Sequence, residues 1–443
     1  MSKHGAKARA GGQNLLTRHR AFIIKALPGL AAIHMLGFAM LGAANNGYLS
    51  AIMVLVQALF AGVVFVVLPP ERAWLQSIWP AKLAWLMLAL WAALPLAAPW
   101  LGLRGLQPPL SPDLYQLSLL TLCGQIMLFM AMTQIARQSQ ACQRHVKAIG
   151  LLAIPIIALC LAAVRLEWID PALLGLGSAR QQRFSGSIGN PNVAGVIFAM
   201  IALLTMGATI TRFRNWLARP TDRSLLTLAF TGATCGFCLT LVVATQSRTA
   251  ALLLFPCLAI LCACSAWPPR TYRRYRLAGA GLLALMALPA IPAFDRLQGL
   301  AEDGASRLAL WERFWLIAWD APWAGYGLGS FIEINQRQLT TDSALAMWDF
   351  GAAHAAPLQL VIELGWPGLA LTMSLFVVVA WRLIRHRDRL RDPVALSMLL
   401  AILLPLGASL VDIAMNVPAV SAMVTSLAAM LYGRSMAPPV IRY

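Results

Sequence analysis

Stretches of about 20 apolar residues alternate along the whole chain with shorter polar segments that carry most of the charges. A helix needs about 20 residues to cross a bilayer, whereas barrel strands are about ten residues long and alternate in polarity. The pattern therefore predicts transmembrane helices, with centres near residues 32, 57, 89, 124, 155, 201, 235, 258, 285, 369, 405 and 426. We expect an all-α integral membrane protein, a single polytopic domain over residues 1–443 with about 12 spans.

The polar segments on one side of the predicted membrane are strongly basic. They read RQSQACQRHVK, TRFRNWLARPTDR, PPRTYRRYR and WRLIRHRDRLRD. Because Lys and Arg collect in cytoplasmic loops, this side is expected to be the cytoplasm, and both termini then lie there as well. The basic N-terminus leads into an apolar run that is long enough to span, so it is interpreted as a first helix rather than a removed signal.

The composition agrees with a membrane protein. Hydrophobic residues make up 59% of the chain and charged residues 12%, where a soluble domain has roughly a quarter. The basic inner loops account for the net charge of +18, so no nucleic-acid partner is expected. Of the eight cysteines, all but Cys142 fall in apolar runs, which predicts no disulfide framework. The CxxC of Cys235 and Cys238 lies inside a predicted span and indicates packing.

Two outer segments are long, about 166–190 and about 294–356, and the second is the one sizeable extramembrane region, inserted between spans 9 and 10. Within it Ser306 is expected to cap the helix RLALWERFWLIAWD, whose Trp and Arg content suits the membrane interface. Pro322 and the following GYGLGS end this helix. The GxG in that stretch follows no strand, so it is interpreted as a flexible loop and not as a nucleotide fingerprint.

The polar residues that could carry chemistry gather on the outer side. His354 is the one histidine predicted there, and the predicted outer cations are all arginines: Arg104, Arg165, Arg180, Arg183, Arg248, Arg296, Arg307, Arg313 and Arg337. Arg248 lies in ATQSRTAALLL, a turn of a few residues between two spans. A charge so near the hydrocarbon is costly unless it is paired or serves a polar cavity; the alternative is that Arg248 snorkels to the surface.

A second candidate lies in RFSGSIGNPNVAG, where Asn190, Pro191 and Asn192 mark a turn into the sixth span. A helix that starts at Pro191 would direct free N–H groups and a positive dipole end outward, which suits an anion. Arg183 precedes this turn. Guanidinium groups bind phosphate through a planar fork of donors, so two or three arginines at one level of the membrane predict a diphosphate cradle.

The outer loops contain no DxD pair and no HExxH, which favours an arginine-bound over a metal-bound diphosphate and predicts no metal site. Single acids leave the metal alternative open: Asp295, Glu302, Asp303 and Asp349. A neutral imidazole at His354 could accept a proton from an attacking hydroxyl. The intramembrane Glu363 and Asp412 are candidates either for function or for helix packing.

Taken in order, the stretches RFSGSIGNPNVAG, TQSRTA, R…W…P…GYGLGSF and HAAPLQLVIELGWPGL resemble the O-antigen ligase family of bacterial inner-membrane glycosyltransferases, over roughly residues 180–370. This superfamily also holds O-antigen polymerases and protein O-oligosaccharyltransferases. The resemblance implies a GT-C-like enzyme that moves a polysaccharide from undecaprenyl diphosphate to lipid A–core at the periplasmic face, without metal, nucleotide sugar or other cofactor. Its partners would be this donor, this acceptor and membrane lipid.

Residue by residue, the resemblance assigns the family's arginines to Arg183 and Arg248 and its histidine to His354. It implies that Arg183 and Arg248, with Arg307 as a third candidate, hold the diphosphate. His354 then activates or orients the acceptor hydroxyl. Asn190, Asn192 and Ser247 are expected to support these groups. Many relatives follow the histidine with asparagine, whereas this chain has Ala355, so the sequence does not say what orients the imidazole.

Other functions stay open at this point. The Asn-Pro-Asn sequence and the modest length favour a ligase, with an O-antigen polymerase as the nearest alternative and a protein O-oligosaccharyltransferase next. A secondary transporter would show inverted repeats and ionisable residues near the midplane. The chain shows no repeat, and its polar chemistry gathers at one face instead. Convergence of Arg183, Arg248 and His354 on one outward-facing site would favour the enzyme.

Overall fold

The computed structural model describes residues 3–98, 100–102, 108–138, 140–170, 183–265, 300–339, 348 and 350–436. Over these residues every regular element is a helix. The elements are α1 (Lys3–Met40), η1 (Gly42–Ala44), α2 (Gly47–Val67), α3 (Arg72–Ser77), α4 (Trp79–Ala97), α5 (Pro112–Ala136), α6 (Ala141–Arg165), α7 (Pro191–Ala218), α8 (Asp222–Thr245), α9 (Arg248–Cys264), α12 (Leu300–Asp320), α13 (Phe331–Arg337), α15 (Ala356–Arg385), η6 (Arg387–Arg391), α16 (Pro393–Ala408), η7 (Ala414–Asn416) and α17 (Pro418–Met436).

Eight of the helices are long and apolar enough to cross a membrane: α1 over His19–Met40, α2, α4, α5, α6, α7, α8 and α15. The shorter apolar helices α9 and α16 and the 19-residue α17 also cover predicted span centres. The centre expected near residue 285 lies outside the described residues. The chain is therefore a multi-pass, all-α membrane protein, as the hydrophobic pattern predicts.

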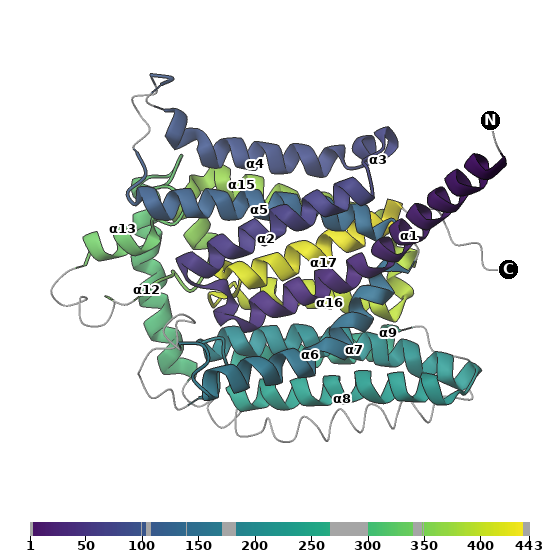
Figure 1. The fold of residues 1–443 in the computed structure, drawn as a ribbon. Coiled ribbons are helices and arrows are strands. Elements are labelled where there is room, and N and C mark those ends of the chain that lie inside the picture. Colours follow the sequence, from purple (N-terminus) through teal and green to yellow (C-terminus); the bar gives the residue numbers. More distant parts are fainter. Residues whose placement is uncertain are drawn as a thin grey trace.

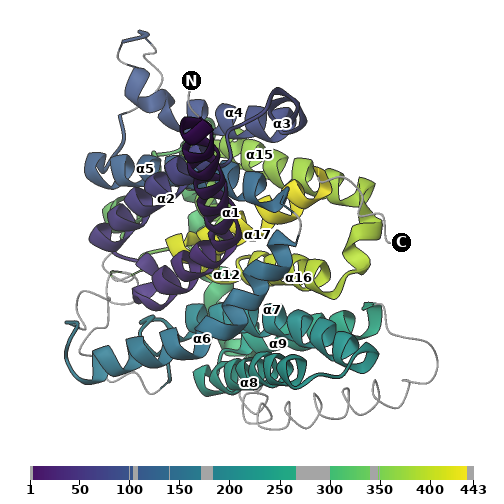
Figure 2. The same ribbon diagram turned by 45° about the vertical axis from the view of Figure 1, so that its right-hand side comes forward.

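The long helices run along one common direction, and α12 and α13 lie across one end of the bundle (Figure 1). The start of α1 and the end of α17 lie at the opposite end. The view in Figure 2 shows α6, α7, α8 and α9 as a group on one side of α16 and α17. We call the end that carries α12 and α13 the α12 end, and the other the basic end, because the Arg-rich stretch from α15 through η6 lies there.

Helix α7 forms the centre of the bundle. In the most apolar 18-residue stretch of α7, 89% of the residues are buried, compared with 11% in the corresponding stretch of α15. Helix α7 is therefore enclosed by protein, whereas α15 presents a wide face to lipid. Helices α6, α8, α9 and α16 all pack against α7. A helix that is apolar on all sides is expected in such an enclosed position. The N-terminal turn of α7 thus lies at the point where several helices meet.

Two expectations for the segment around α12 change in the structure. The prediction that Ser306 caps this helix is wrong, because Ser306 lies inside α12, which already includes Leu300. The first residues of the helix, Leu300, Ala301 and Glu302, are good helix formers. The GYGLGS stretch is hydrogen-bonded to a break in α15. At the break, Gly365 has φ +69°, and the N–H groups of Tyr326 and Gly327 donate to the carbonyls of Ile362 (2.8 Å) and Glu363 (2.9 Å).

Candidate functional site

The first turn of α7 is built by the Asn-Pro-Asn sequence. Asn190 is the N-cap residue, and its Oδ1 accepts hydrogen bonds from the backbone N–H groups of Asn192 (2.9 Å) and Val193 (3.3 Å). Pro191 follows as the first helical residue, where its missing N–H costs nothing. The helix start predicted from the sequence is confirmed. The expectation of free N–H groups there changes, because Asn190 takes two of them.

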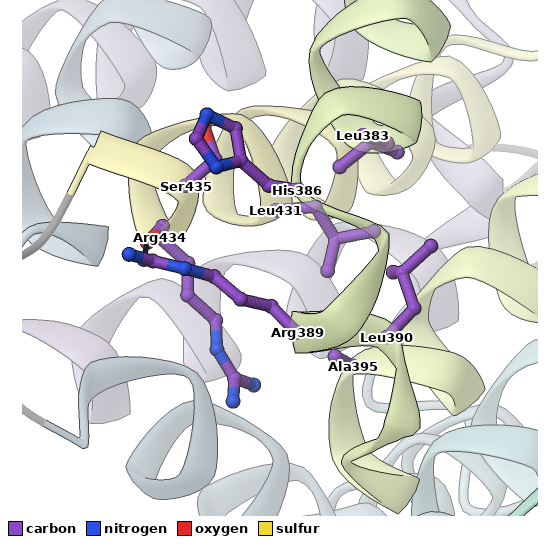
Figure 3. Close-up of a pocket in the computed structure, with 8 residues that line it drawn as sticks. All are labelled: Leu383, His386, Arg389, Leu390, Ala395, Leu431, Arg434 and Ser435. Atoms are coloured by element: carbon purple, nitrogen blue, oxygen red, sulfur yellow. Dashed lines mark hydrogen bonds between the residues drawn. The ribbon is translucent and has the colours of Figure 1, made fainter. Parts of the chain in front are cut away.

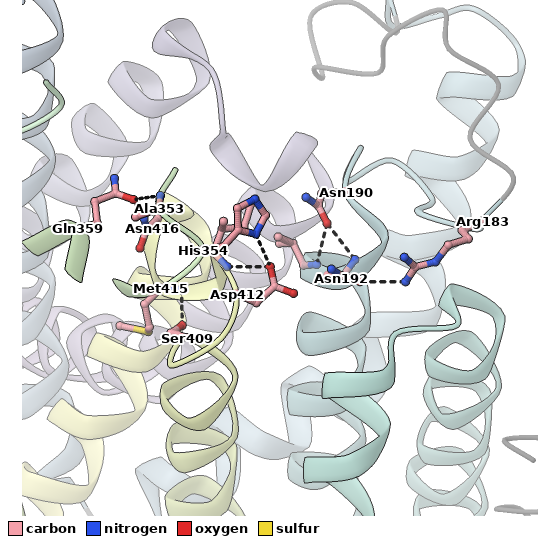
Figure 4. A network of polar contacts seen from close by, with 12 residues as sticks. Arg183, Asn190, Asn192, Ala353, His354, Gln359, Ser409, Asp412, Met415 and Asn416 are labelled. Atoms are coloured by element: carbon pink, nitrogen blue, oxygen red, sulfur yellow. Dashed lines mark hydrogen bonds and ion pairs between the residues drawn. The ribbon is translucent and has the colours of Figure 1, made fainter. Parts of the chain in front are cut away.

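Arg183 joins this turn to the end of the next helix along the chain. Its Nε donates to the carbonyl of Thr245 (3.0 Å), the last residue of α8, and its Nη2 donates to Oδ1 of Asn192 (2.8 Å) (Figure 4). The side chain is half-buried. The guanidinium group is therefore held in a defined orientation beside the first turn of α7.

Arg248 begins α9, after a tight turn. Gln246 is the C-cap residue that follows α8, and its backbone is in the left-handed conformation (φ 51°). The buried Ser247 caps α9, because its side chain accepts a hydrogen bond from the N–H of Ala250 (3.4 Å). This turn lies directly against α7, since a Cβ atom added to Gly195 would be 2.7 Å from Cβ of Ser247 and 2.9 Å from Oγ1 of Thr245. Glycine at 195 permits this close approach, which brings the turn that carries Arg248 next to the residues that hold Arg183.

His354 lies in the segment before α15, and an acidic side chain faces it. Its Nδ1 is 3.6 Å from Oδ1 of Asp412, an ion-pair separation longer than a hydrogen bond. The imidazole side chain is 31% exposed, and the carboxylate is 4% exposed. The ring of Phe350 packs edge-on against the imidazole, with centroids 5.4 Å apart. Asp412 and Phe350 are thus side chains that face the imidazole in this chain, in which Ala355 follows the histidine.

The backbone at His354 has φ 51°, a conformation that costs a non-glycine residue about 1–3 kcal/mol. Hydrogen bonds on either side hold it there. The N–H of Ala353 donates to Oε1 of Gln359 (3.2 Å), which also accepts from Nδ2 of Asn416. The N–H of Ala356 donates to the carbonyl of Ser409 (2.8 Å). The loop that carries Asp412 and the loop that carries His354 are therefore tied to each other.

These groups gather around α7. Helix α16 packs against both α7 and α9, and η7, which follows Asp412, also contacts α7. Figure 4 shows His354 and Asp412 beside the start of α7, with Arg183 beyond Asn192. The structure therefore brings His354 and Arg183 to the same end of the bundle, and it places the first residue of α9, Arg248, in the turn that contacts Arg183 through Thr245.

Other candidates from the sequence lie elsewhere or outside the described part of the chain. Arg307 belongs to α12, but its side chain is not among the described groups. Glu363 is buried in α15, where its Oε1 accepts from Nε2 of Gln359 (3.0 Å). Asp295 and Asp349 lie outside the described residues. Asp412 was left open between function and packing; its position beside His354 is the feature that sequence reasoning did not supply.

The site can separate charge in a defined way. Arg183 supplies a positive group that two hydrogen bonds fix beside the first turn of α7, whose dipole adds to the same sign, and Arg248 adds a second charge from the turn that packs against α7. Asp412 supplies a buried negative group on one side of the imidazole. With Nδ1 of His354 facing this carboxylate, Nε2 is the ring nitrogen that is placed to accept a proton. Such an arrangement suits the attack of a hydroxyl group on a carbon that carries a phosphorylated leaving group.

Residues 233–373 match the model of a family that is described as O-antigen ligase. The matched segment extends from α8 into α15, and it includes Arg248, Arg307 and His354. Arg183 and Asp412 lie outside it. A comparison with curated proteins finds no match to the chain.

Proposed function

We propose, from the match of residues 233–373 to the O-antigen ligase family, that this chain is an O-antigen ligase. In this proposal the protein transfers O-antigen polysaccharide from undecaprenyl diphosphate to lipid A–core. The family supports the coarser function, an O-antigen ligase or polymerase type of membrane glycosyltransferase. The observation that carries the proposed glycosyl transfer is the His354–Asp412 pair near the start of α7, where Arg183 is held and the turn with Arg248 packs. The Asn-Pro-Asn sequence and the modest length of the chain favour a ligase over a polymerase.

The two arginines are proposed to bind the diphosphate of the donor. As its bond to the anomeric carbon breaks, negative charge grows on the departing diphosphate. Positive groups that are already oriented stabilise that charge at no further reorganisation cost. The two hydrogen bonds that fix Arg183 supply this preorganisation. We propose that the arginines perform the role that a divalent cation performs for other phosphorylated donors, and Arg307 remains a candidate third ligand.

His354 is proposed to act as the general base. Its Nε2 accepts the proton of the acceptor hydroxyl, the hydroxyl oxygen forms a bond to the anomeric carbon, and the carbon–oxygen bond to the diphosphate breaks. The electron pair leaves with undecaprenyl diphosphate. Asp412 stabilises the imidazolium that results and keeps Nδ1 protonated, so it is a positioning residue. Because both substrates carry lipid tails, the reaction takes place at a membrane surface.

We further propose that the α12 end faces the periplasm of a bacterial inner membrane and that the termini are cytoplasmic. The Arg-rich stretch from α15 through η6 at the basic end supports this orientation, since basic residues collect on the cytoplasmic side. The long segment with α12 and α13 then lies on the side where completed O-antigen is joined to lipid A–core.

The decisive experiment is complementation of a Gram-negative strain that lacks its ligase but still makes a compatible O-antigen carrier. Lipopolysaccharide is resolved on a gel for the wild type, His354→Ala and Arg248→Ala, with expression followed by immunoblot. Arg337→Ala is the matched control, because this exposed arginine pairs with Glu333 on α13 and not with the site. We expect an O-antigen ladder on lipid A–core for the wild type and the control, and bare lipid A–core for the two site variants.

A well-expressed wild type that leaves lipid A–core bare, in a strain with a matched donor, would contradict the ligase assignment. The same plasmid is then introduced into a strain that lacks its O-antigen polymerase. Growth of single repeat units into long chains in that strain would identify the protein as a polymerase with the same donor chemistry.

A further inference from the structure

A small cavity lies at the basic end of the bundle, between the C-terminal ends of α15 and α17 and the short helix η6 (Figure 3). His386, Arg389 and Arg434 contribute polar groups to its lining, and Leu383, Leu390 and Leu431 contribute an apolar wall. None of these residues belongs to the site around His354. The lining is unusual because three cationic or ionisable groups converge beside leucines.

The hydrogen bonding of these groups leaves capacity for a further acceptor. Arg434 forms an ion pair with Asp392 through Nη2 (2.6 Å), but its Nη1 is buried and has no hydrogen-bond partner among the described residues. Arg389 donates to the backbone carbonyl of Arg434 through Nη1, which holds the two arginines together. A buried donor without a partner calls for an explanation, and a bound acceptor would provide one.

The charges around the cavity repel one another. The pKa of His386 is lowered by burial and by the neighbouring Arg382, Arg389 and Arg385. The pKa of Arg389 is lowered by burial and by Arg434 and Arg382. Asp392 already pairs with Arg434, and Asp388 lies within ion-pair distance of Arg391, at 3.9 Å on the exposed surface. A bound anion would relieve this repulsion.

We propose that this cavity binds the phosphate group of an anionic phospholipid from the leaflet at the basic end. Arg389 and Nη1 of Arg434 donate to the phosphate oxygens, and Leu383, Leu390 and Leu431 contact the glycerol and the first acyl carbons. The apolar wall favours a lipid over free phosphate. The adjacent turn of α15 faces the bilayer, because its Trp381 and Ile384 are 44% and 67% exposed. Basic pockets between helices are known to bind such head groups.

The test uses the full-length protein purified in detergent and native mass spectrometry. The protein is titrated with dioleoyl phosphatidylglycerol and with dioleoyl phosphatidylcholine, which has the same acyl chains and no net charge. Arg389→Gln removes one ligand, and Leu390→Trp fills the cavity with every charge retained. Arg387→Gln removes the same charge from an exposed position on η6 that does not line the cavity.

We expect one tightly bound phosphatidylglycerol, with phosphatidylcholine held at least about tenfold more weakly, as for the loss of a hydrogen bond between charged groups. Arg389→Gln and Leu390→Trp should each lower the affinity for phosphatidylglycerol by about tenfold or more. Arg387→Gln should leave that affinity unchanged. Equal losses in Arg389→Gln and Arg387→Gln would show diffuse attraction to the surface and would overturn the proposal. Equal binding of the two lipids would also overturn it, as would full displacement of the lipid by millimolar inorganic phosphate.

Thermal unfolding without added lipid distinguishes binding from folding. Leu390→Trp keeps the hydrogen bond from Arg389 to Arg434, so it tests the cavity even if Arg389→Gln lowers stability. Unfolding temperatures close to that of the wild type, together with lost lipid binding in Leu390→Trp, support the site. Retained lipid binding in a folded Leu390→Trp protein would contradict it. The binding assay requires no transferase activity, so its outcome is independent of the proposed function.

Discussion

At the residue scale, the contact between His354 and Asp412 allows the base and the group that orients it to be separated experimentally. Asp412→Asn keeps an Oδ1 that can still accept from the N–H of Ile413 (2.8 Å in the wild type), so the loop is preserved, but it removes the charge that stabilises the imidazolium. We expect kcat of purified protein with a polyprenyl-diphosphate donor to fall about 100-fold, within the range of about 10²–10⁴ for a general base, with little change in KM.

Asp388→Asn is the control for this prediction, because Asp388 is exposed on η6 at the opposite end of the bundle. Its kcat should equal that of the wild type. An Asp412→Asn protein with wild-type kcat would show that the carboxylate only packs, which was the other interpretation of this acid. A lower kcat of Asp412→Asn that is accompanied by a lower unfolding temperature of this variant would point to the same conclusion.

Arg183 tests whether geometry or charge matters more. Arg183→Lys retains the charge, but one ammonium group cannot donate both to the carbonyl of Thr245 and to Asn192 in the same geometry. We expect kcat/KM for the donor to fall about tenfold or more, because a charge-assisted hydrogen bond is lost and the cation is no longer oriented. The measurement is the rate at limiting donor, with Arg337→Lys as the control. If Arg183→Lys retained the wild-type kcat/KM, the site would require only a positive charge at position 183 and not the geometry of the guanidinium group.

Single residues also show how far sequence reasoning extends. Asn190 and Pro191 predict a helix start because their local chemistry fixes it, and α7 begins there. The carbonyl of Thr245 carries no side-chain signal, so its bond with Arg183 depends on how α7 and α8 pack and cannot be predicted from the residue type. The same holds for Asp412, which lies 58 positions from His354 along the chain and meets it only because the loop after α16 is hydrogen-bonded to the segment around the start of α15.

At the element scale, the close approach of α7 to the turn between α8 and α9 depends on Gly195. A methyl group there would meet Cβ of Ser247 at 2.7 Å and Cβ of Ala250 at 3.0 Å, so Gly195→Ala must displace the turn that carries Arg248. We expect a loss of about 1–3 kcal/mol in stability, as for other overpacked sites, together with reduced transferase activity. Thermal unfolding in detergent and the rate of glycan transfer are the measurements.

Gly232→Ala is the matched control, since the added methyl group would have only Cγ2 of Thr209 within reach, at an ordinary 3.8 Å. Alanine is also the better helix former, so this variant should be at least as stable as the wild type. Equal unfolding temperatures for Gly195→Ala and Gly232→Ala would mean that the turn moves away without cost. In that case the position of Arg248 would not depend on this contact.

The sequence predicts the positions of the helices well, but it predicts their ends and breaks poorly. The span centres follow from apolar runs, which reflect the bilayer rather than any tertiary contact. The break in α15 does not. It depends on Gly365, whose Cβ position lies 2.0 Å from the carbonyl oxygen of Trp323, and on the indole of Trp91, which donates to the carbonyl of Leu364 (2.8 Å). These partners lie far along the chain, so the apolar pattern over the same residues predicts an unbroken span.

At the scale of the whole molecule, the proposed chemistry requires one orientation in the membrane. His354 lies just before the first residue of α15 and η6 follows the last one, so the two lie at opposite ends of this helix. Helix α13, at the α12 end (Figure 1), is on the side of His354, because Nδ2 of Asn335 donates to the carbonyl of Phe350 (3.4 Å). Only if the α12 end is periplasmic can the site meet completed O-antigen and lipid A–core. The orientation also places the Arg-rich stretch from α15 through η6 in the cytoplasm, as the distribution of basic residues along the sequence predicts.

Cysteine labelling with a membrane-impermeant maleimide tests this orientation, in a chain whose exposed Cys123 and Cys264 are replaced by serine. Ile332→Cys lies at an exposed position of α13, and Asp388→Cys at an exposed position of η6. We expect Ile332→Cys to be labelled in cells whose outer membrane alone is permeable, and Asp388→Cys only after the inner membrane is disrupted. The reverse pattern would place His354 in the cytoplasm, away from any completed glycan, and would exclude ligation at this site whatever its local geometry.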